Sequence, residues 1–146
     1  MKRSMLDSLD KTLVKLLQTD ARQNSNALAK HLGVNSSTIR RRIEKLLKDE
    51  VIRFVVIPDP KKIGLPLQAV VAFDVAEDML KSVLEKLGNL EEVQWLTVTT
   101  GRFDVLASIW VPSTEELFHF LEEFVAKLEG VRNTETFICL HVEKHR

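Results

Sequence analysis

One stretch decides the fold of the first half of the chain: Leu28-Ala29-Lys30-His31-Leu32-Gly33-Val34-Asn35-Ser36-Ser37-Thr38-Ile39. Apolar residues recur at helical spacing up to Leu32, and Gly33 is a helix stop. Asn35 or Ser36 then caps a new helix after only a short turn. Two short helices joined by a tight turn that contains glycine are typical of a helix-turn-helix, which the stretch therefore predicts.

Helix signals extend this unit on both sides. A first helix begins at the capping residue Asp7 and ends near Thr19-Asp20, with leucines on one face. The second helix has Ser25 as its N-cap, and the third runs to about Asp49. The sequence therefore predicts three helices in the first domain.

The third helix has an outer face suited to nucleic acid. With Ile39 directed to the core, its polar side chains gather on the opposite side. Hydroxyls near the helix start reach phosphates or base edges, and arginine binds guanine through two hydrogen bonds, although a merely solvated face is the alternative. Arg42 points nearer the core, where we expect it to pair with an acid or cover apolar neighbours. The predicted DNA-binding residues are Ser36, Ser37, Thr38, Arg40, Arg41 and Lys45.

Charge is distributed unevenly along the chain, although the net charge is zero. Residues 1–62 hold 14 Lys and Arg against 7 Asp and Glu, and residues 63–146 hold 7 against 14. A basic half is the footprint of nucleic-acid binding, because Lys and Arg release counterions from phosphates. Chance clustering is the alternative. The asymmetry indicates two domains with different partners, the first partner being double-stranded DNA.

After the third helix, Val51-Ile52-Arg53-Phe54-Val55-Val56-Ile57 is a β-branched and aromatic run that predicts a strand. This strand would make the first domain a winged helix-turn-helix. Pro58 and Pro60 exclude both helix and central strand beyond it. We therefore predict a DNA-binding domain over 1–57, a linker over 58–66 and a second domain over 67–146.

The second domain carries strands and helices in the order β-α-β-β-α-β. Gly101-Arg102 fits a two-residue hairpin loop between its two middle strands. This order is the ferredoxin-like split motif, so the predicted fold class is α+β. The predicted elements are strands 67–75, 93–100, 103–111 and 131–143 and helices 77–88 and 113–128.

Both faces of the predicted sheet carry apolar side chains. Two helices cover only one face of a four-stranded sheet, and an exposed apolar patch of this size marks an interface. We therefore expect a second copy to cover the other face, giving at least a homodimer with two recognition helices roughly 34 Å apart. By the parity of their numbers, we expect Trp95, Val105, Ile109 and Val111 on one face and Leu96, Val98, Leu106 and Trp110 on the other.

The sequence shows no catalytic or metal-binding constellation. The four histidines lie on separate predicted elements without metal-ligand spacing, and no glycine-rich phosphate loop is present. We expect no enzymatic activity, metal or cofactor. The sequence contains one cysteine, Cys139, which falls in a strand pattern. Because a disulfide needs two cysteines, no disulfide can form within the chain. No apolar run is long enough to span a membrane, so the expected location is the cytoplasm.

The chain resembles the Lrp/AsnC family of prokaryotic regulators over essentially its whole length. Each matching motif is weak alone, but their order and spacing together are specific. The motifs are Leu6-Asp7-x-x-Asp10, Leu28-Ala29-x-x-Leu32-Gly33-Val34, Thr38-Ile39-x-Arg41-Arg42-Ile43-x-x-Leu46, Val51-Ile52-Arg53, Thr99-Thr100-Gly101-Arg102-Phe103-Asp104 and Gly130-Val131-x-x-Thr134-x-Thr136.

The resemblance implies a C-terminal domain of the RAM type, which regulates amino-acid metabolism. In that family the sheets pair into dimers, dimers often assemble into octamers or other rings, and small effectors, usually amino acids, bind between subunits near the hairpin. Asp104 would accept a hydrogen bond from an effector's ammonium group. The alternative is that Gly101 and Asp104 serve only to form the hairpin loop. Glu50 stands where the family usually has glycine, so we expect a different helix ending there. The implied effector-site residues are Thr99, Thr100, Gly101, Arg102, Phe103, Asp104, Thr134 and Thr136.

Two other functions compete with this interpretation. An architectural protein would wrap DNA without sensing a ligand, with steep salt dependence and little sequence preference. The siroheme decarboxylases share the two-domain layout, but they would need a cluster of His and Arg in the second domain, where His119, His141 and His145 are scattered. We therefore predict a sequence-specific transcriptional regulator modulated by a small effector such as an amino acid.

Overall fold

The computed structural model describes residues 6–143 and divides the chain into two compact units, Met1–Val56 and Ile57–Arg146. Each unit has its own hydrophobic core. Within the described range, no helix is long and apolar enough to cross a membrane. His145, considered above, lies outside the described residues.

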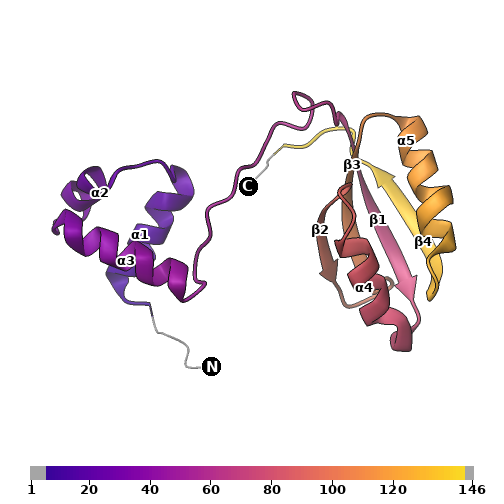
Figure 1. The fold of residues 1–146 in the computed structure, drawn as a ribbon, viewed down its shortest axis with the longest axis horizontal. Helices are drawn as coiled ribbons and strands as arrows, with labels where there is room; N and C mark the ends of the chain where they lie inside the picture. Colours follow the sequence, from indigo (N-terminus) through magenta and orange to yellow (C-terminus); the bar gives the residue numbers. More distant parts are fainter. Residues whose placement is uncertain (1–5, 144–146) are drawn as a thin grey trace. The chain divides into compact units, whose positions relative to one another are not determined.

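The first unit contains three helices, as predicted: α1 (Ser8–Thr19), α2 (Ser25–Leu32) and α3 (Ser36–Lys48) (Figure 1). The Asp7 carboxylate caps α1 by accepting from the backbone N–H of Asp10 at 2.8 Å. The cap of α2 is Asn24 and not Ser25, because the Asn24 side-chain oxygen accepts from the N–H of Ala27 at 2.8 Å. The buried core consists of Leu13, Leu17, Leu28, Ala29, Ile39 and Leu46.

Gly33 makes the tight turn between α2 and α3. Its φ of 66° lies in the left-handed region, where glycine has no side chain to clash. The N–H of Val34 then donates to the carbonyl of Ala29 at 3.1 Å, which satisfies a carbonyl at the end of α2. The helix-turn-helix predicted from residues 28–39 is therefore confirmed.

The end of α3 corrects the expectation for Glu50. Glu50 itself adopts the left-handed conformation, with a φ of 54°, although it is not glycine. The N–H of Val51 donates to the carbonyl of Leu46 at 2.8 Å, so the helix ends as it would with glycine. A side chain in this conformation costs on the order of 1 kcal/mol. The expected change of helix ending was therefore wrong.

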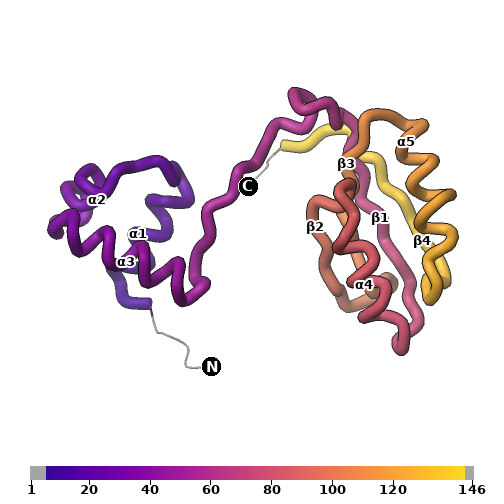
Figure 2. The backbone as a smooth tube through the Cα atoms, in the orientation of Figure 1, coloured from indigo at the N-terminus to yellow at the C-terminus, as the bar shows by residue number. Residues whose placement is uncertain are grey.

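Residues 51–57 do not form the predicted strand. Beyond α3 the chain continues without helical turns (Figure 2), and within the described part of the chain this segment pairs with no strand. The side chains of residues 54–57 are exposed. A strand needs hydrogen-bonding partners in a neighbouring strand, and the single chain supplies none here. The helix-turn-helix is thus present without the predicted wing.

The second unit contains a four-stranded sheet in the order β2-β3-β1-β4, with every neighbouring pair antiparallel (Figure 1). This confirms the α+β, ferredoxin-like fold. A 3₁₀ turn (Glu77–Met79) precedes the first helix, and irregular helical turns (Phe120–Phe124 and Val125–Lys127) extend the second. The elements are β1 (Leu67–Val75), α4 (Leu80–Gly88), β2 (Val93–Val98), β3 (Val105–Val111), α5 (Thr114–His119) and β4 (Val131–Ile138).

Two boundaries of the sheet differ from the prediction. β4 ends at Ile138 and not at residue 143, because its ladder with β1 ends at the pair of Ala69 and Ile138 and only the N–H of Cys139 adds one further bond, to Gln68. The hairpin between β2 and β3 is a six-residue loop, 99–104, and not Gly101-Arg102 alone. The loop is longer because the N–H of Asp104 donates to the carbonyl of Phe73 in β1, at 2.9 Å.

Strand register, and not residue parity, decides which side chains share a face. Trp95 lies opposite Ser108 and Leu96 opposite Ala107, with an irregularity in register between Val93 and Trp95. Leu96 therefore packs against the core, and Trp95 lies on the other face, which corrects the predicted assignment.

One face of the sheet packs against α4 and the helical segment that begins at α5, and it forms the core of the unit. We name the other side the open face, because neither helix covers it. Trp95 and Phe137, which lie on it, are 46% and 53% exposed. The open face is formed by Gln68, Val70, Ala72, Trp95, Leu106, Ser108, Trp110 and Phe137.

Candidate functional sites

The outer face of α3 presents cations to solvent. Ile39 and Leu46 bury the inner side of the helix, while Arg40, Arg41 and Lys45 are exposed. Within residues 6–143 these three cations form no ion pair, so they are available to an external anion. Among the predicted hydroxyl-bearing residues, Ser37 is exposed and Ser36 and Thr38 are half-buried.

Arg42 instead joins α3 to α1. Its guanidinium Nη1 lies 2.6 Å from a carboxylate oxygen of Asp7 and 2.7 Å from one of Asp10. Its Nε is buried without a hydrogen-bond partner in the described range. The expectation that Arg42 pairs with an acid is confirmed. Arg42 is therefore a structural residue that fixes how α3 packs against α1.

The Asp7 carboxylate has two tasks, as cap of α1 and as partner of Arg42. The backbone N–H of Asp10 is the main cause that lowers the pKa of Asp7 below its ordinary value of 3.8, and the hydrogen bond from Arg42 lowers it further. The same contacts, first with Asp10 and then with Asp7, raise the pKa of Arg42. Charged carboxylates are thus part of the fold of the helix-turn-helix.

The loop 99–104 is tied to the sheet by its own residues. The Thr99 hydroxyl donates to the carbonyl of Phe103 at 2.6 Å, and the Thr99 N–H donates to the carbonyl of Asp104 at 2.9 Å. One carboxylate oxygen of Asp104 accepts from the N–H of Val75 at 2.8 Å. Asp104 therefore has a structural task at this site, as one of the two interpretations of the sequence held. Gly101, at the loop tip, has a φ of 114°.

Two ion pairs at this end of the sheet involve residues that the sequence analysis did not single out. Arg102 pairs with Glu135 of β4 and stacks over the Phe103 ring, 5.2 Å from its centroid. Arg132 lies 3.0 Å from the carboxylate of Asp74 and donates to the carbonyl of Val75 at 2.7 Å. Nothing in the local sequence marks these pairs, because strand register across β1 brings them together.

Thr134 and Thr136 lie apart from the loop candidates. They face the helix-covered side of β4, opposite Phe73 and Val71 of β1. They line a cavity of about 320 Å³ together with Leu121 and residues 125, 126 and 131–133. No residue of the loop 99–104 lines this cavity. The single chain thus brings together the loop and Glu135, but it does not unite the loop with the two threonines.

A helix-turn-helix with an exposed basic face, joined to a separate βαββαβ domain, defines a two-domain DNA-binding regulator. The model of the AsnC-type helix-turn-helix domain matches residues 6–47, and that of the Lrp/AsnC ligand binding domain matches residues 68–146. The chain belongs to the Lrp/AsnC family of transcriptional regulators, as its motifs indicated.

Relatives in archaea match nearly the whole chain. An HTH-type transcriptional regulator of Pyrococcus furiosus is 41% identical over 141 residues, covering 96% of this chain and 95% of the relative. The HTH-type transcriptional regulator FL11 of the same organism is 33% identical over 143 residues, covering 97% and 94%. Both relatives are named as transcriptional regulators of the helix-turn-helix type.

Solved structures share the fold along the same length. AsnC of E. coli superposes with a TM-score of 0.86 at 28% identity, covering 97% of both chains. A transcriptional regulator of Neisseria meningitidis, solved as a complex with L-Met, has a TM-score of 0.88 at 22% identity and covers 96% of this chain and 93% of its own.

The Arg42 contacts predict a pH-dependent stability of the first unit. Arg42→Gln removes the cation from two carboxylates, so we expect its melting temperature at pH 7 to fall by several degrees. The control Arg41→Gln changes an exposed side chain on the same helix and should leave the midpoint unchanged. Circular dichroism melting of the full-length variants measures both.

The sign of the pH effect follows from Asp7. Its folded pKa is lowered, so its contribution is present above the unfolded value of 3.8 and is lost as the pH falls through the folded pKa. The difference in melting temperature between wild type and Arg42→Gln should therefore become smaller below pH 3.8. Two results would contradict this account. One is that Arg41→Gln lowers the melting temperature as much as Arg42→Gln does. The other is that the effect of Arg42→Gln on the melting temperature is unchanged in acid.

Proposed function

We propose that this chain regulates transcription by placing α3 in the major groove of DNA. The proposal rests on the different environments of three consecutive arginines. Arg42 is held by carboxylates of α1, while Arg40 and Arg41 remain exposed beside it. Buried on one side and basic on the other, α3 presents its cations as a recognition helix does. The proposed contact residues are Ser36, Ser37, Thr38, Arg40, Arg41 and Lys45, acting in the cytoplasm.

Arg41→Ala tests this contact without touching the fold. Loss of one good arginine contact costs about 1–3 kcal/mol of binding, so affinity for the operator should fall at least fivefold. Lys15→Ala, which removes an exposed cation from α1, is the control and should bind normally. Mobility shifts with the upstream DNA of the gene measure both at one fixed salt concentration. Equal affinity of Arg41→Ala and wild type would contradict the proposal.

Specific recognition also separates a regulator from an architectural protein. Unrelated DNA of equal length should displace the protein from the operator only when it is present in large excess. Equal competition by both DNAs, with the same steep dependence on salt, would favour the architectural alternative.

We also propose that the open face joins two copies of the chain. Trp95 and Phe137 leave large apolar area exposed beside the half-buried Val70 and Leu106. A patch of this kind, left uncovered by the unit's own helices, is suited to an interface. A dimer with two-fold symmetry would carry two α3 helices to successive major grooves, and dimers could combine further into an octamer or another ring.

Trp95→Glu tests the interface in the full-length chain. The new charge lies on an exposed position, so the fold should remain, but it would be buried at the interface. Light scattering should then give the mass of one chain, 16.7 kDa, where wild type gives at least twice that mass. Phe118→Glu, at an aromatic position of α5 that is 55% exposed, is the matched control and should keep the wild-type mass. A dimeric Trp95→Glu would refute the proposed interface.

We further propose that the loop 99–104 takes part in binding a small effector, such as an amino acid, between subunits. The loop is pre-organised by Thr99 and Asp104, which hold it to the sheet. Thr100 and Gly101 remain exposed at its tip, where a ligand has access to backbone groups. The proposed effector residues are Thr99, Thr100, Gly101, Arg102, Phe103 and Asp104, with Thr134 and Thr136 supplied by β4.

The effector is sought by adding each of the twenty amino acids, L-methionine included, to protein and operator DNA. One of them should raise the melting temperature and alter the mobility shift. Thr100→Val preserves shape but removes the hydroxyl at the loop tip, so it should weaken that response roughly tenfold. Thr12→Val, in the first unit, is the control. Absence of a response to all twenty amino acids would refute the amino-acid proposal, even if DNA still binds.

A further inference from the structure

The outer face of α3 carries one acidic residue among its cations. Glu44 is the single acid within this helix. At about 100° per residue, Glu44 lies roughly 140° around the helix from the buried Ile39, and Arg41 lies roughly 160° from it in the other direction. Both side chains are exposed. The side of α3 that faces away from the core is therefore not uniformly basic, and Glu44 lies near its middle.

The Glu44 carboxylate has no partner among the described residues. It forms no hydrogen bond or ion pair there, although Lys48 lies four residues further along the same helix. Pairs at this spacing are common on helix surfaces. The second unit contains one, between Glu123 and Lys127. Glu44 is thus a hydrogen-bond acceptor that remains free on the exposed side of α3.

A free carboxylate on this side of α3 has a cost when the helix enters DNA. The duplex carries one negative charge for roughly every 1.7 Å of its axis, so its phosphates repel the carboxylate. The carboxylate also loses water in the groove, and this loss is offset only where a base supplies a hydrogen-bond donor. In the major groove the donors are the N4 amino group of cytosine and the N6 amino group of adenine. Glu44 would therefore weaken binding to most sequences and favour a few.

We propose that Glu44 determines base specificity by accepting a hydrogen bond from the N4 amino group of a cytosine in the major groove. This role rests on the proposed placement of α3 in that groove. Cytosine is favoured over adenine because adenine also presents its N7 acceptor, which would repel the second carboxylate oxygen. Arg41, whose Cβ atom is about 5–6 Å away at this helical spacing, would bind a neighbouring guanine. Arg41 would thus supply affinity, while Glu44 would discriminate between sequences.

Selection of binding sites from random duplex DNA by the full-length protein tests this role. The sequences that wild type enriches should contain a position at which cytosine is required. Glu44→Ala should keep the preferences at the other positions but accept all four bases at this one. Glu44→Gln should favour adenine at the same position, because a glutamine amide binds N6 and N7 of adenine together. Melting curves of both variants should match wild type, since Glu44 has no contact in the fold.

The ratio of two affinities gives the size of the effect. Mobility shifts measure the affinity of each variant for the site that wild type selects and for unrelated DNA at one fixed salt concentration. The ratio of the first affinity to the second should fall at least ~5-fold in Glu44→Ala, because one base contact is lost and a source of repulsion is removed. Its affinity for unrelated DNA should equal or exceed that of wild type.

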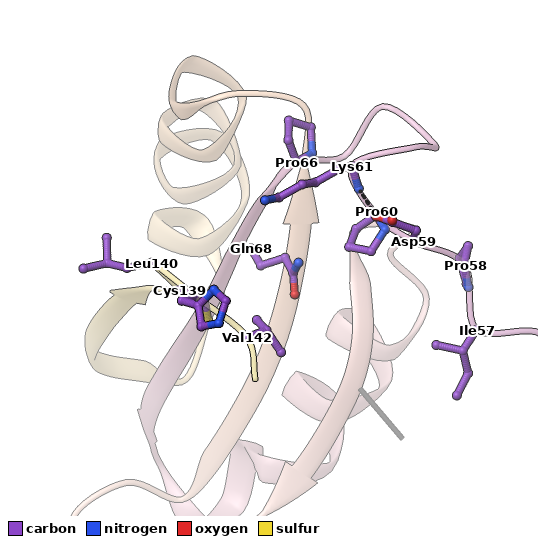
Figure 3. A pocket seen from close by; sticks show the side chains of 11 residues that line it. Ile57, Pro58, Asp59, Pro60, Lys61, Pro66, Gln68, Cys139, Leu140 and Val142 are labelled. Carbon is purple, nitrogen blue, oxygen red and sulfur yellow. Dashed lines mark hydrogen bonds between the residues drawn. The ribbon is translucent and has the colours of Figure 1, made fainter. Parts of the chain in front are cut away.

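Asp59→Asn is the matched control for charge. It removes one negative charge outside α3, from the segment that follows the first unit. The Asp59 carboxylate accepts from the backbone N–H of Lys61 at 3.1 Å (Figure 3), and the amide oxygen of asparagine can accept in the same way. This variant should therefore keep the base preferences of wild type, with a ratio of affinities within about twofold of it.

Two results would overturn the proposal. One is that Glu44→Ala keeps the wild-type preference at every position, which would make Glu44 a solvated side chain and no more. The other is that the position it changes is one where wild type selects a base other than cytosine. Failure of the proposed function looks different, because wild type would then enrich no sequence and Arg41→Ala would bind DNA as wild type does. That outcome would overturn the role of Glu44 as well.

Discussion

The second unit depends on the pairing of β1 along both of its edges. β3 and β4 both bond to β1, so its alternate residues, among them Val71 and Phe73, are fully buried beneath the helices. The same strand organises what lies at its two ends. Near its C-terminal end, Phe73 and Val75 bind the backbone and carboxylate of Asp104, which sets the loop 99–104. Near its start, the Gln68 carbonyl holds the backbone of Cys139.

In the first unit, electrostatics complete what hydrophobic packing begins. The buried leucines of α1, α2 and α3 fix the helices in one cluster, but apolar contacts are non-directional and leave the rotation of α3 loosely specified. Arg42 restricts the rotation of α3, because its guanidinium pairs with two carboxylates of α1 in a defined geometry. With one arginine fixed inward, the neighbouring Arg40 and Arg41 turn outward. The Arg42 contacts therefore help to determine which face of α3 is exposed, and this is the face that we propose contacts DNA.

The sequence was sufficient wherever structure depends on near neighbours. The bounds of β1, the cap at Asp7 and the inward role of Arg42 all follow from periodicity and local chemistry. It failed where distant residues decide. The face of Trp95 depends on register with β3, and the loop 99–104 is longer than predicted because Asp104 bonds to β1. The run 51–57 has the composition of a strand but lacks a partner in one chain. The DNA and effector contacts themselves remain predictions, since they need a second molecule.

The proposed effector loop is held by one rigid element. Asp104 bonds the loop 99–104 to Phe73 and Val75 of β1. A ligand influences DNA binding only if it binds two states of the protein with different affinity. The loop 99–104 can do so through the proposed contact between subunits. An effector bound there would therefore control DNA binding through the assembly of the chains.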